Sequence, residues 1–303
     1  MRIAVLGPGG VGGLVAGALD HAGTPVTLVA RESTAELIAA RGLRVSSVRL
    51  GDFLAHPHAV ARLEEPVEAL VVATKATGLH EALERIAAPP ALVVPLLNGL
   101  DHLAVLRARF GEQTVVAGTI RVEADRPEPG VVVHSSPFLR IDMASAHAAA
   151  RPGMEALAAK LQAAGIPARV EESEPQVLWG KLVRLNALAC TTSAYDKLLG
   201  EILTTPELRA ELVGAIEEGC AVAAAEGASI DAADPLGELS AAHPTLGSSM
   251  LRDIAAGRPP ELDAIPGAVL RAAARHRVAC PTIERLVGAI AKRVGVPAPI
   301  PAQ

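Results

Sequence analysis

One lysine, Lys181, lies inside a long apolar run of this 303-residue chain, the stretch VLWGKLVRLNALAC (177–190). Such a lysine can lay its stem along apolar surface and keep its ammonium group in water. It can also lie in a cleft and donate a proton to an oxygen atom on which negative charge develops. The stretch fits both interpretations, so the choice depends on which other groups the chain supplies.

A second chemical signal stands at the N-terminus, where AVLGPGGVGG carries glycines in the pattern G-x-G-x-x-G. The pattern follows an apolar strand and opens a helix, which is the context that a dinucleotide-binding turn requires. In such a turn Gly7 allows the tight bend, Gly9 lets a pyrophosphate approach the backbone, and Gly12 lets helix and strand pack closely. The helix N-terminus then faces the phosphates. We therefore predict a dinucleotide site rather than a glycine-rich turn without a ligand.

The residues after the next strand-like run, PVTLVA (25–30), bear on the choice of dinucleotide. NAD sites usually have an Asp or Glu there, which binds the ribose 2′-hydroxyl. This chain has Arg31, whose guanidinium suits a 2′-phosphate, and Lys75 offers a second cation after the run VVATK. Glu32 is the argument for NAD, and both cations could be plain solvated charges. Because both cations lie at the carboxyl edge of the predicted sheet, we predict NADP (NADPH) as the cofactor.

Another strand-like run, ALVVPLLNG (91–99), ends in Asn98 and Gly99. An Asn-Gly pair at a strand end is often only a turn. At the carboxyl edge of a sheet the Asn98 amide could equally bind a ribose or a substrate. The sequence leaves both interpretations open.

Short apolar runs alternate with amphipathic segments through the first half of the chain. This alternation is typical of βαβ units and a parallel sheet. The runs are apolar throughout, as expected for strands covered on both faces. Two later runs, PGVVVHSS (129–136) and FLRIDMA (138–144), are predicted to pair as an antiparallel hairpin.

From about residue 174 the pattern changes to long segments with a 3.6-residue period. Helices are predicted at 174–189, 205–226, 247–257, 261–277 and 281–294. The predicted fold class is therefore α/β, with an N-terminal Rossmann-type doubly wound sheet followed by an all-α C-terminal domain. The domains are predicted at residues 1–172 and 173–303, and the Pro-rich tail VPAPIPAQ (296–303) is predicted to fray.

Composition and charge argue against several classes of protein. A net charge of −5 and an aromatic content of 2% do not suit nucleic-acid binding. The three cysteines, Cys190, Cys220 and Cys280, form no C-x-x-C pair, which indicates free thiols rather than metal ligands. The sequence shows neither a signal-peptide pattern nor an apolar run of transmembrane length. We expect a cytoplasmic protein that binds no metal, nucleic acid or membrane.

An ordered set of short motifs resembles the ketopantoate reductase (2-dehydropantoate 2-reductase) family along essentially the whole chain. The motifs are GPGGVGG, the arginine after the second strand, TKA, NG, AGT (117–119), LWGKL, SSML with DI, and ELDAIPG. The resemblance implies a Rossmann domain followed by an all-α domain, with the active site between them. It implies reduction of ketopantoate to pantoate with NADPH, on the pathway to pantothenate and coenzyme A. We also expect a homodimer formed through the helical half.

The resemblance assigns roles to individual residues. Lys181 is implied as the acid that protonates the ketone oxygen, Glu261 as the group that orients the substrate hydroxyl, and Ser249 as a ligand of the substrate carboxylate. Asn98 is implied beside the nicotinamide ribose and the substrate. The predicted cofactor site as a whole consists of Gly7, Gly9, Gly10, Val11, Gly12, Arg31, Lys75, Asn98 and Ala124.

Simple physical chemistry supports the lysine and offers plainer roles for the other two groups. Hydride addition to a ketone builds negative charge on oxygen, and a cation that also delivers a proton stabilises that charge. Glu261 follows GRPP at a predicted helix start, where a carboxylate is favoured by the helix dipole alone. Ser248 and Ser249 could likewise be only N-caps of the helix that begins at MLRDIAAG.

The helix of Lys181 departs from the family pattern. The family usually has Asn one turn and two turns after the lysine, where this chain has Leu185 and Ala189. Asn186 cannot replace them, because five residues turn a helix by about 500° and leave it roughly 140° from the face of the lysine. Arg184 lies nearer that face, either as a second cation in the cleft or as an ordinary exposed charge.

Two further departures lie outside that helix. Leu246 stands where the family has Asn before the serine pair, and Arg121 stands where the family often has Thr, with Glu123 two residues on. A reductase of a different 2-oxo acid, ketone or imine is therefore the first alternative to a ketopantoate reductase. A dinucleotide-binding regulator without turnover is the second, and the presence of Lys181 and Glu261 argues against it.

Overall fold

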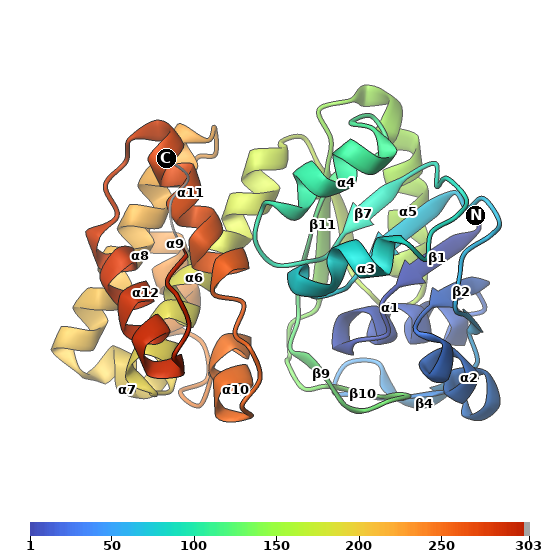
Figure 1. Ribbon diagram of the computed structural model, residues 1–303, viewed down its shortest axis with the longest axis horizontal. Helices are drawn as coiled ribbons and strands as arrows, with labels where there is room; N and C mark the ends of the chain where they lie inside the picture. Colours follow the sequence, from blue (N-terminus) through green and yellow to red (C-terminus); the bar gives the residue numbers. More distant parts are fainter. Residues whose placement is uncertain (300–303) are drawn as a thin grey trace. The chain divides into compact units, whose positions relative to one another are not determined.

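The computed structural model describes residues 1–299, and the chain forms two compact units. The first unit consists of Met1–Leu97 and His102–Val177. The second consists of Asn98–Asp101 and the chain from Leu178 onward, whose helices are drawn in yellow to red in Figure 1. The final part of the tail predicted to fray, residues 300–303, lies outside the described residues.

A parallel five-stranded sheet in the order β5-β2-β1-β6-β7 organises the first unit. All of its neighbouring strands run parallel, which confirms the predicted sheet. The order reverses between β1 and β6, and folds of this kind bind ligands beyond the carboxyl ends of the strands at such a point. Its strands are β1 (Ile3–Leu6), β2 (Val26–Val29), β5 (His58–Val60), β6 (Ala69–Val72) and β7 (Val93–Pro95).

Helix α1 (Gly10–His21) follows β1 and packs closely on a second, four-stranded sheet in the order β4-β3-β10-β9. A Cβ atom at Gly13 would lie 2.6 Å from Val132, and one at Gly17 would lie 2.8 Å from Val45. The small residues of the predicted helix therefore let its backbone approach this sheet. The strands of the second sheet are β3 (Leu43–Ser47), β4 (Gly51–Ala55), β9 (Ala124–Glu128) and β10 (Val131–His134).

The predicted hairpin of 129–136 and 138–144 is wrong, because the two strands lie in different sheets. Strand β10 pairs with β3 and β9, whereas β11 (Arg140–Ala144) pairs with β8 (Ala117–Arg121) and β12 (Ala168–Glu171). Buried polar contacts hold β10 on β3, since His134 Nδ1 lies 2.8 Å from the hydroxyl of Ser47. The Ser136 hydroxyl donates to the Phe138 carbonyl at 2.7 Å and turns the chain away from that sheet. Adjacent strands in sequence therefore take different partners.

Helices and two short 3-10 turns complete the first unit. They are α2 (Glu32–Arg41), η1 (Ala76–Gly78), α3 (Leu79–Leu83), α4 (His102–Phe110), η2 (Ala148–Ala150) and α5 (Arg151–Ala163). Helix α6 (Glu174–Tyr195) begins in the first unit and continues in the second. Its first residue is fixed within the first unit, because Arg107 of α4 donates to the Glu174 carboxylate at 2.7 Å.

The second unit is helical, as predicted, around a core that includes Trp179, Ile216, Val269 and Ile283. Besides α6 it contains α7 (Leu199–Thr204), α8 (Pro206–Ala225), α9 (Ala233–Ser240), α10 (Ser249–Ala255), η3 (Asp263–Gly267), α11 (Ala268–His276) and α12 (Pro281–Val294). Across residues 1–299 no helix combines the length and apolar character needed to cross a membrane.

The helix predicted at 261–277 starts as a π-helix, η3, and becomes an α-helix only at Ala268. Pro266 lies inside η3 and has no N–H group for the regular helical ladder. The Gly267 amide instead donates to the Leu262 carbonyl at 3.1 Å, five residues back. A wide turn of this kind often marks a functional segment.

Candidate active site

Three of the predicted site residues form one hydrogen-bonded row in the second unit. The Lys181 ammonium donates to the Asn98 side-chain oxygen at 2.8 Å, and the Asn98 amide nitrogen donates to the Glu261 carboxylate at 3.1 Å. The orientation of the amide follows from its neighbours, because an ammonium group can only donate and a carboxylate can only accept. Asn98 therefore connects a proton donor to an acceptor through one rigid group.

Lys181 extends from α6 between residues that belong to the core. Its neighbours Leu182 and Val183 are buried, whereas Lys181 itself is half-buried. A snorkelling lysine would keep its ammonium group in water. The bond to Asn98 shows that this ammonium group is instead directed at a specific partner.

The Asn98-Gly99 pair forms the predicted turn, and the binding of a ribose or substrate by Asn98 stays a prediction. Gly99 has a φ of +82°, in the left-handed region that favours glycine, so the pair does form a bend. A Cβ atom at Gly99 would collide with the carbonyl oxygen of Ala264 in η3. The bend therefore packs directly on the η3 backbone, and this contact brings the Asn98 amide to Glu261, two residues before η3 begins.

Of the serine pair, Ser248 has a structural role, and the structure shows no role for Ser249. Ser248 is the N-cap of α10: its hydroxyl accepts from the Leu251 amide at 3.0 Å and lies 2.9 Å from the hydroxyl of Thr192. Ser249 is half-buried, and within residues 1–299 its hydroxyl makes no hydrogen bond to Lys181, Asn98 or Glu261. The N-cap interpretation thus describes Ser248, and the substrate role of Ser249 stays a prediction.

The polar residues that follow Lys181 on α6 have separate environments. Asn186 is fully buried and accepts from the Cys190 thiol at 3.5 Å, which agrees with its predicted direction away from the lysine. Arg184 is paired with Glu238 of α9 at 3.2 Å and its side chain is only 15% exposed, so it is not an ordinary exposed charge. Leu185 is half-buried, and Ala189 is fully buried.

Two of the departures outside α6 also have clear structural surroundings. Leu246 packs against the core of the second unit, and its carbonyl accepts from the Leu199 amide at 2.9 Å. Arg121 ends β8 in the first unit and is half-buried. The Glu123 amide donates to the Ser136 hydroxyl at 2.9 Å, which fixes the chain just before β9.

In the glycine-rich turn of the first unit, local packing or backbone conformation requires glycine at Gly7, Gly10 and Gly12 but not at Gly9. Gly7 has a φ of +99°, and a Cβ atom at Gly12 would collide with the Gly7 carbonyl oxygen. A Cβ atom at Gly10 would collide with the backbone of Ala124, so two predicted cofactor residues lie side by side. At Gly9, by contrast, the nearest protein atom to a Cβ would be 3.9 Å away. The open space at Gly9 suits the close approach of a ligand to the backbone.

The two charged residues after β2, Arg31 and Glu32, each form an ion pair with a residue of the segment 81–85. Arg31, the N-cap of α2, is 70% exposed and lies 3.3 Å from Glu81. Arg85 lies 3.3 Å from Glu32 and also donates to the carbonyls of Ala30 and Ala61. The pKa of the Glu32 carboxyl group is lowered by a backbone hydrogen bond and by Arg85. Arg31 and Glu32 are thus both largely exposed, at 70% and 71%, and each is paired with a residue of opposite charge.

The remaining predicted cofactor residues flank this region. Lys75 is exposed and is the N-cap residue of η1, just beyond the carboxyl end of β6. Val11 is half-buried in the first turn of α1 and packs against the core of the first unit.

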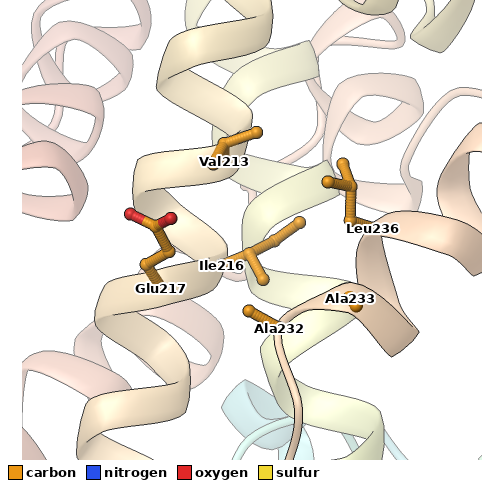
Figure 2. A pocket seen from close by; sticks show the side chains of 6 residues that line it. All are labelled: Val213, Ile216, Glu217, Ala232, Ala233 and Leu236. Atoms are coloured by element: carbon orange, nitrogen blue, oxygen red, sulfur yellow. The ribbon is translucent and has the colours of Figure 1, made fainter.

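A separate cavity of about 250 Å³ lies between α8 and α9, and Figure 2 shows the side chains that line it. They are Val213, Ile216, Glu217, Ala232, Ala233 and Leu236. This lining is apolar except for one carboxylate, and it contains none of the predicted site residues. It offers no proton donor for reduction of a ketone.

The three cysteines are free thiols, and the pKa of each is raised. Burial raises the pKa of Cys190 to about 12, and burial together with Glu218 and Glu284 raises the pKa of Cys280 to about 12. Cys220 is half-buried and also has a raised pKa, for which burial is the first cause. No group of three or more His, Cys, Asp or Glu residues suited to a metal ion occurs in the described part of the chain.

Comparison with known proteins places these features in a family. The protein-family model described as "Ketopantoate reductase PanE/ApbA" matches residues 3–146, and the family model "Ketopantoate reductase PanE/ApbA C terminal" matches residues 175–294. A 2-dehydropantoate 2-reductase of Halobacterium salinarum is 30% identical over 298 residues, covering 94% of this chain and 96% of the relative. The chain therefore belongs to the ketopantoate reductase family, and it is an oxidoreductase of that type.

Solved structures agree with this placement. The 2-dehydropantoate 2-reductase of Geobacter metallireducens is 27% identical, with a TM-score of 0.88 over 97% of this chain and 100% of the other. A D-mandelate dehydrogenase in complex with NADH and anilino(oxo)acetate is 20% identical, with a TM-score of 0.87 over 98% of this chain and 100% of the other. The second likeness shows a shared fold among enzymes with different substrates.

Proposed function

We propose that this chain reduces 2-dehydropantoate (ketopantoate) to pantoate with NADPH, and that Lys181 is the general acid. The observation that carries the proposal is the row of Lys181, Asn98 and Glu261, joined by hydrogen bonds of 2.8 and 3.1 Å. The row combines a proton donor, a group that orients it and a carboxylate that fixes the orienting group. Such a triad of roles suits reduction of a carbonyl group.

In the proposed reaction a C–H bond and an O–H bond form as the C=O double bond of the ketone becomes a single bond. NADPH supplies the hydride when it is bound. The Lys181 ammonium stabilises the negative charge that develops on the carbonyl oxygen, donates a proton to it, and regains a proton from water.

Asn98 and Glu261 support this proton transfer in different ways. The Asn98 oxygen fixes the direction of one Lys181 N–H bond, which lowers the cost of placing the ammonium group. A carboxylate can accept several hydrogen bonds, so Glu261 can hold Asn98 and the substrate hydroxyl together. Ser249 is proposed to bind the substrate carboxylate.

Residues of the first unit fit a dinucleotide with a 2′-phosphate. The turn at Gly7, Gly9 and Gly12 opens α1, whose N-terminal amides suit a pyrophosphate, and Gly9 leaves its approach open. Arg31 and Lys75 are exposed cations after β2 and β6 and are proposed to bind the 2′-phosphate. The ion pair of Glu32 with Arg85 supports the proposal of NADPH, because Arg85 competes for the carboxylate that would bind a ribose 2′-hydroxyl.

The wider assignment follows from this activity. We propose an NADP-binding domain at residues 1–172 and a catalytic domain at residues 173–303. We also propose a role in pantothenate biosynthesis in the cytoplasm, and a homodimer formed through the helical domain.

Oxidation of NADPH by the purified protein, followed at 340 nm with ketopantoate, tests the proposal. We expect Lys181→Ala to lower kcat by about 100-fold or more, with the Kd of NADPH changed less than about twofold. Lys197→Ala is the matched control, because Lys197 follows the end of α6 and pairs with Glu201 on the surface. An unchanged kcat in Lys181→Ala would remove the proposed acid.

A second candidate function is reduction of a 2-oxo acid with a more apolar side chain. Leu185 favours it, because this half-buried residue lies one helical turn after Lys181 and presents an apolar group near the lysine's face. A panel of 2-oxo acids with branched or aromatic side chains distinguishes the candidates. Turnover of such an acid without turnover of ketopantoate would reject the first substrate and keep the reaction class.

A further inference from the structure

The segment Asn98–Asp101 folds with the second unit, although the chain on both sides of it belongs to the first. Besides the hydrogen bonds of Asn98 to Lys181 and Glu261, three contacts hold the segment. Leu100 packs against the core of the second unit, Gly99 lies on the carbonyl of Ala264, and Asp101 is bonded to Arg271. Of these three, only the contact of Asp101 with Arg271 joins two charged side chains, and such pairs have a well-defined geometry.

Arg271 of α11 binds two aspartates at once. Its Nη2 donates to the Asp101 carboxylate at 2.5 Å and to the Asp263 carbonyl at 2.9 Å, and its Nη1 donates to the Asp263 carboxylate at 2.7 Å. The Arg271 side chain is 20% exposed, compared with 51% for Asp101 and 78% for Asp263. Burial lowers the pKa of Arg271, but the bonds to Asp101 and Asp263 outweigh it and raise the pKa overall. The guanidinium group is thus the common centre of the cluster.

The backbone leaves room for this cluster. A Cβ atom at Gly267 would lie 3.1 Å from the Asp263 carboxylate and 3.2 Å from Arg271 Nη1. A side chain at Gly267 would therefore press on the ion pair. The absence of one lets the guanidinium reach across the junction of η3 and α11 to the segment that carries Asn98.

We propose that Arg271 is a positioning residue for the reaction proposed above. By tying Asp101 to η3, Arg271 holds the Asn98 amide between Lys181 and Glu261. The inference deepens the proposed function and rests on it for its catalytic consequence. Its structural part, the fixing of residues 98–101, does not depend on which substrate is used.

Two variants test the proposal from opposite ends of the ion pair. Arg271→Met removes the guanidinium and keeps an apolar stem, and Asp101→Ala removes only the partner that lies in the segment 98–101. We expect hydrogen–deuterium exchange in peptides covering residues 98–101 to become about tenfold faster in both variants. We expect kcat with ketopantoate to fall about 10-fold or more, with the KM of NADPH changed less than about twofold. Arg271→Lys should restore part of the loss, because it keeps the charge without the fork.

Arg275→Ala is the matched control, since Arg275 lies one turn later on α11 and pairs with Glu226 instead. It should leave exchange at residues 98–101 and kcat unchanged. Asp101→Ala keeps the assay interpretable if Arg271→Met does not fold. Unchanged exchange at residues 98–101 in Asp101→Ala, or a kcat within about twofold of the parent protein, would overturn the proposal.

The design separates this inference from the proposed function. If the parent protein does not turn over ketopantoate, the proposed substrate fails while faster exchange at residues 98–101 still supports the fixing role of Arg271. If the parent protein is active and Lys181→Ala is not, but Arg271→Met behaves like Arg275→Ala, the proposed function stands and the positioning role is rejected.

Discussion

Replacing the Asn98 amide by a carboxylate is the most direct test of the hydrogen-bonded row. Asn98→Asp keeps the size and shape of the side chain and the bond to Lys181, but it removes the N–H donor that faces Glu261 at 3.1 Å. The variant therefore places two carboxylates in contact. In place of one donated hydrogen bond there is repulsion between like charges.

The size of the effect follows from the geometry. A hydrogen bond to a charged group contributes about 1.5–3 kcal/mol. Two unit charges about 4 Å apart repel by about 4 kcal/mol at an effective dielectric constant of 20. The Lys181 ammonium, 2.8 Å from the Asn98 oxygen, offsets a large part of that repulsion because it attracts the new carboxylate. The net penalty is then at least that of the lost hydrogen bond, about 1.5–3 kcal/mol, or a fall in kcat of about 10- to 160-fold.

The penalty of Asn98→Asp should grow as the pH rises. Repulsion raises the pKa of the carboxylate pair, so one of the two groups takes up a proton as the pH falls. The protonated pair regains an O–H donor between position 98 and Glu261. At high pH both groups are charged and hold the Lys181 proton more tightly, which makes the lysine a weaker acid. We expect the ratio of the kcat of the parent protein to that of Asn98→Asp to rise from pH 6 to pH 8.

Steady-state assays at saturating NADPH from pH 5.5 to 8.5 measure this ratio, with Asn98→Ala as the uncharged control. Asn98→Ala loses both bonds and should show a ratio that changes much less with pH. A kcat for Asn98→Asp equal to that of the parent protein, or a ratio that is flat with pH, would refute the reasoning about the row.

Three other perturbations probe neighbouring parts of the structure. Gly99→Ala should lower the free energy of unfolding by at least about 1–2 kcal/mol and lower Tm as a result, because φ is +82° and the new methyl group would meet the Ala264 carbonyl. Arg85→Met should release Glu32 and lower the ratio of kcat/KM for NADPH to that for NADH about 10-fold. Burial lowers the pKa of His134, so its contribution to stability, present above the unfolded pKa of about 6.5, should be lost as the pH falls below it.

Each of these expectations has a matched measurement. Gly111→Ala is the control for Gly99, because Gly111 also has a positive φ, +89°, but its Cβ would meet no atom within 4 Å. Equal loss of Tm in both variants would contradict the proposed contact with η3. The free energy of urea unfolding should depend less steeply on pH between pH 7.5 and 5 in His134→Gln than in the parent protein. A cofactor ratio that Arg85→Met leaves unchanged would contradict the role given to the pairing of Arg85 with Glu32.

The parts of the fold that the sequence predicted correctly are those set by local periodicity. The fully apolar runs of β1 and β6 lie buried in a parallel sheet, and the long helical segments of the second half form helices. Short elements were missed, including α7 and α9, because six or eight residues show too little of a 3.6-residue period. The hairpin failed because strand pairing depends on long-range polar contacts such as that of His134 with Ser47.

In the candidate site too, local sequence patterns predict the direction of a side chain but not its distant partner. Lys181, Arg184 and Asn186 lie within six positions on α6, yet one binds Asn98, one pairs with Glu238 and one is buried beside Cys190. Helical geometry predicted that Asn186 points away from Lys181, because angle follows from spacing. It could not identify the partner of Lys181, which lies 83 residues away, nor that of Asn98, which lies 163 residues away.

The contribution of Arg271 was beyond sequence reasoning for a related physical reason. Its two partners, Asp101 and Asp263, lie on a loop and on a π-helix, and a helical pattern drawn through 261–277 places Asp263 in an ordinary first turn. The wide turn that Pro266 imposes changes the angle between Asp263 and α11, and the bare Gly267 leaves space for the guanidinium. A departure from regular helix thus creates the geometry that orients Asn98, and no periodic pattern can encode it.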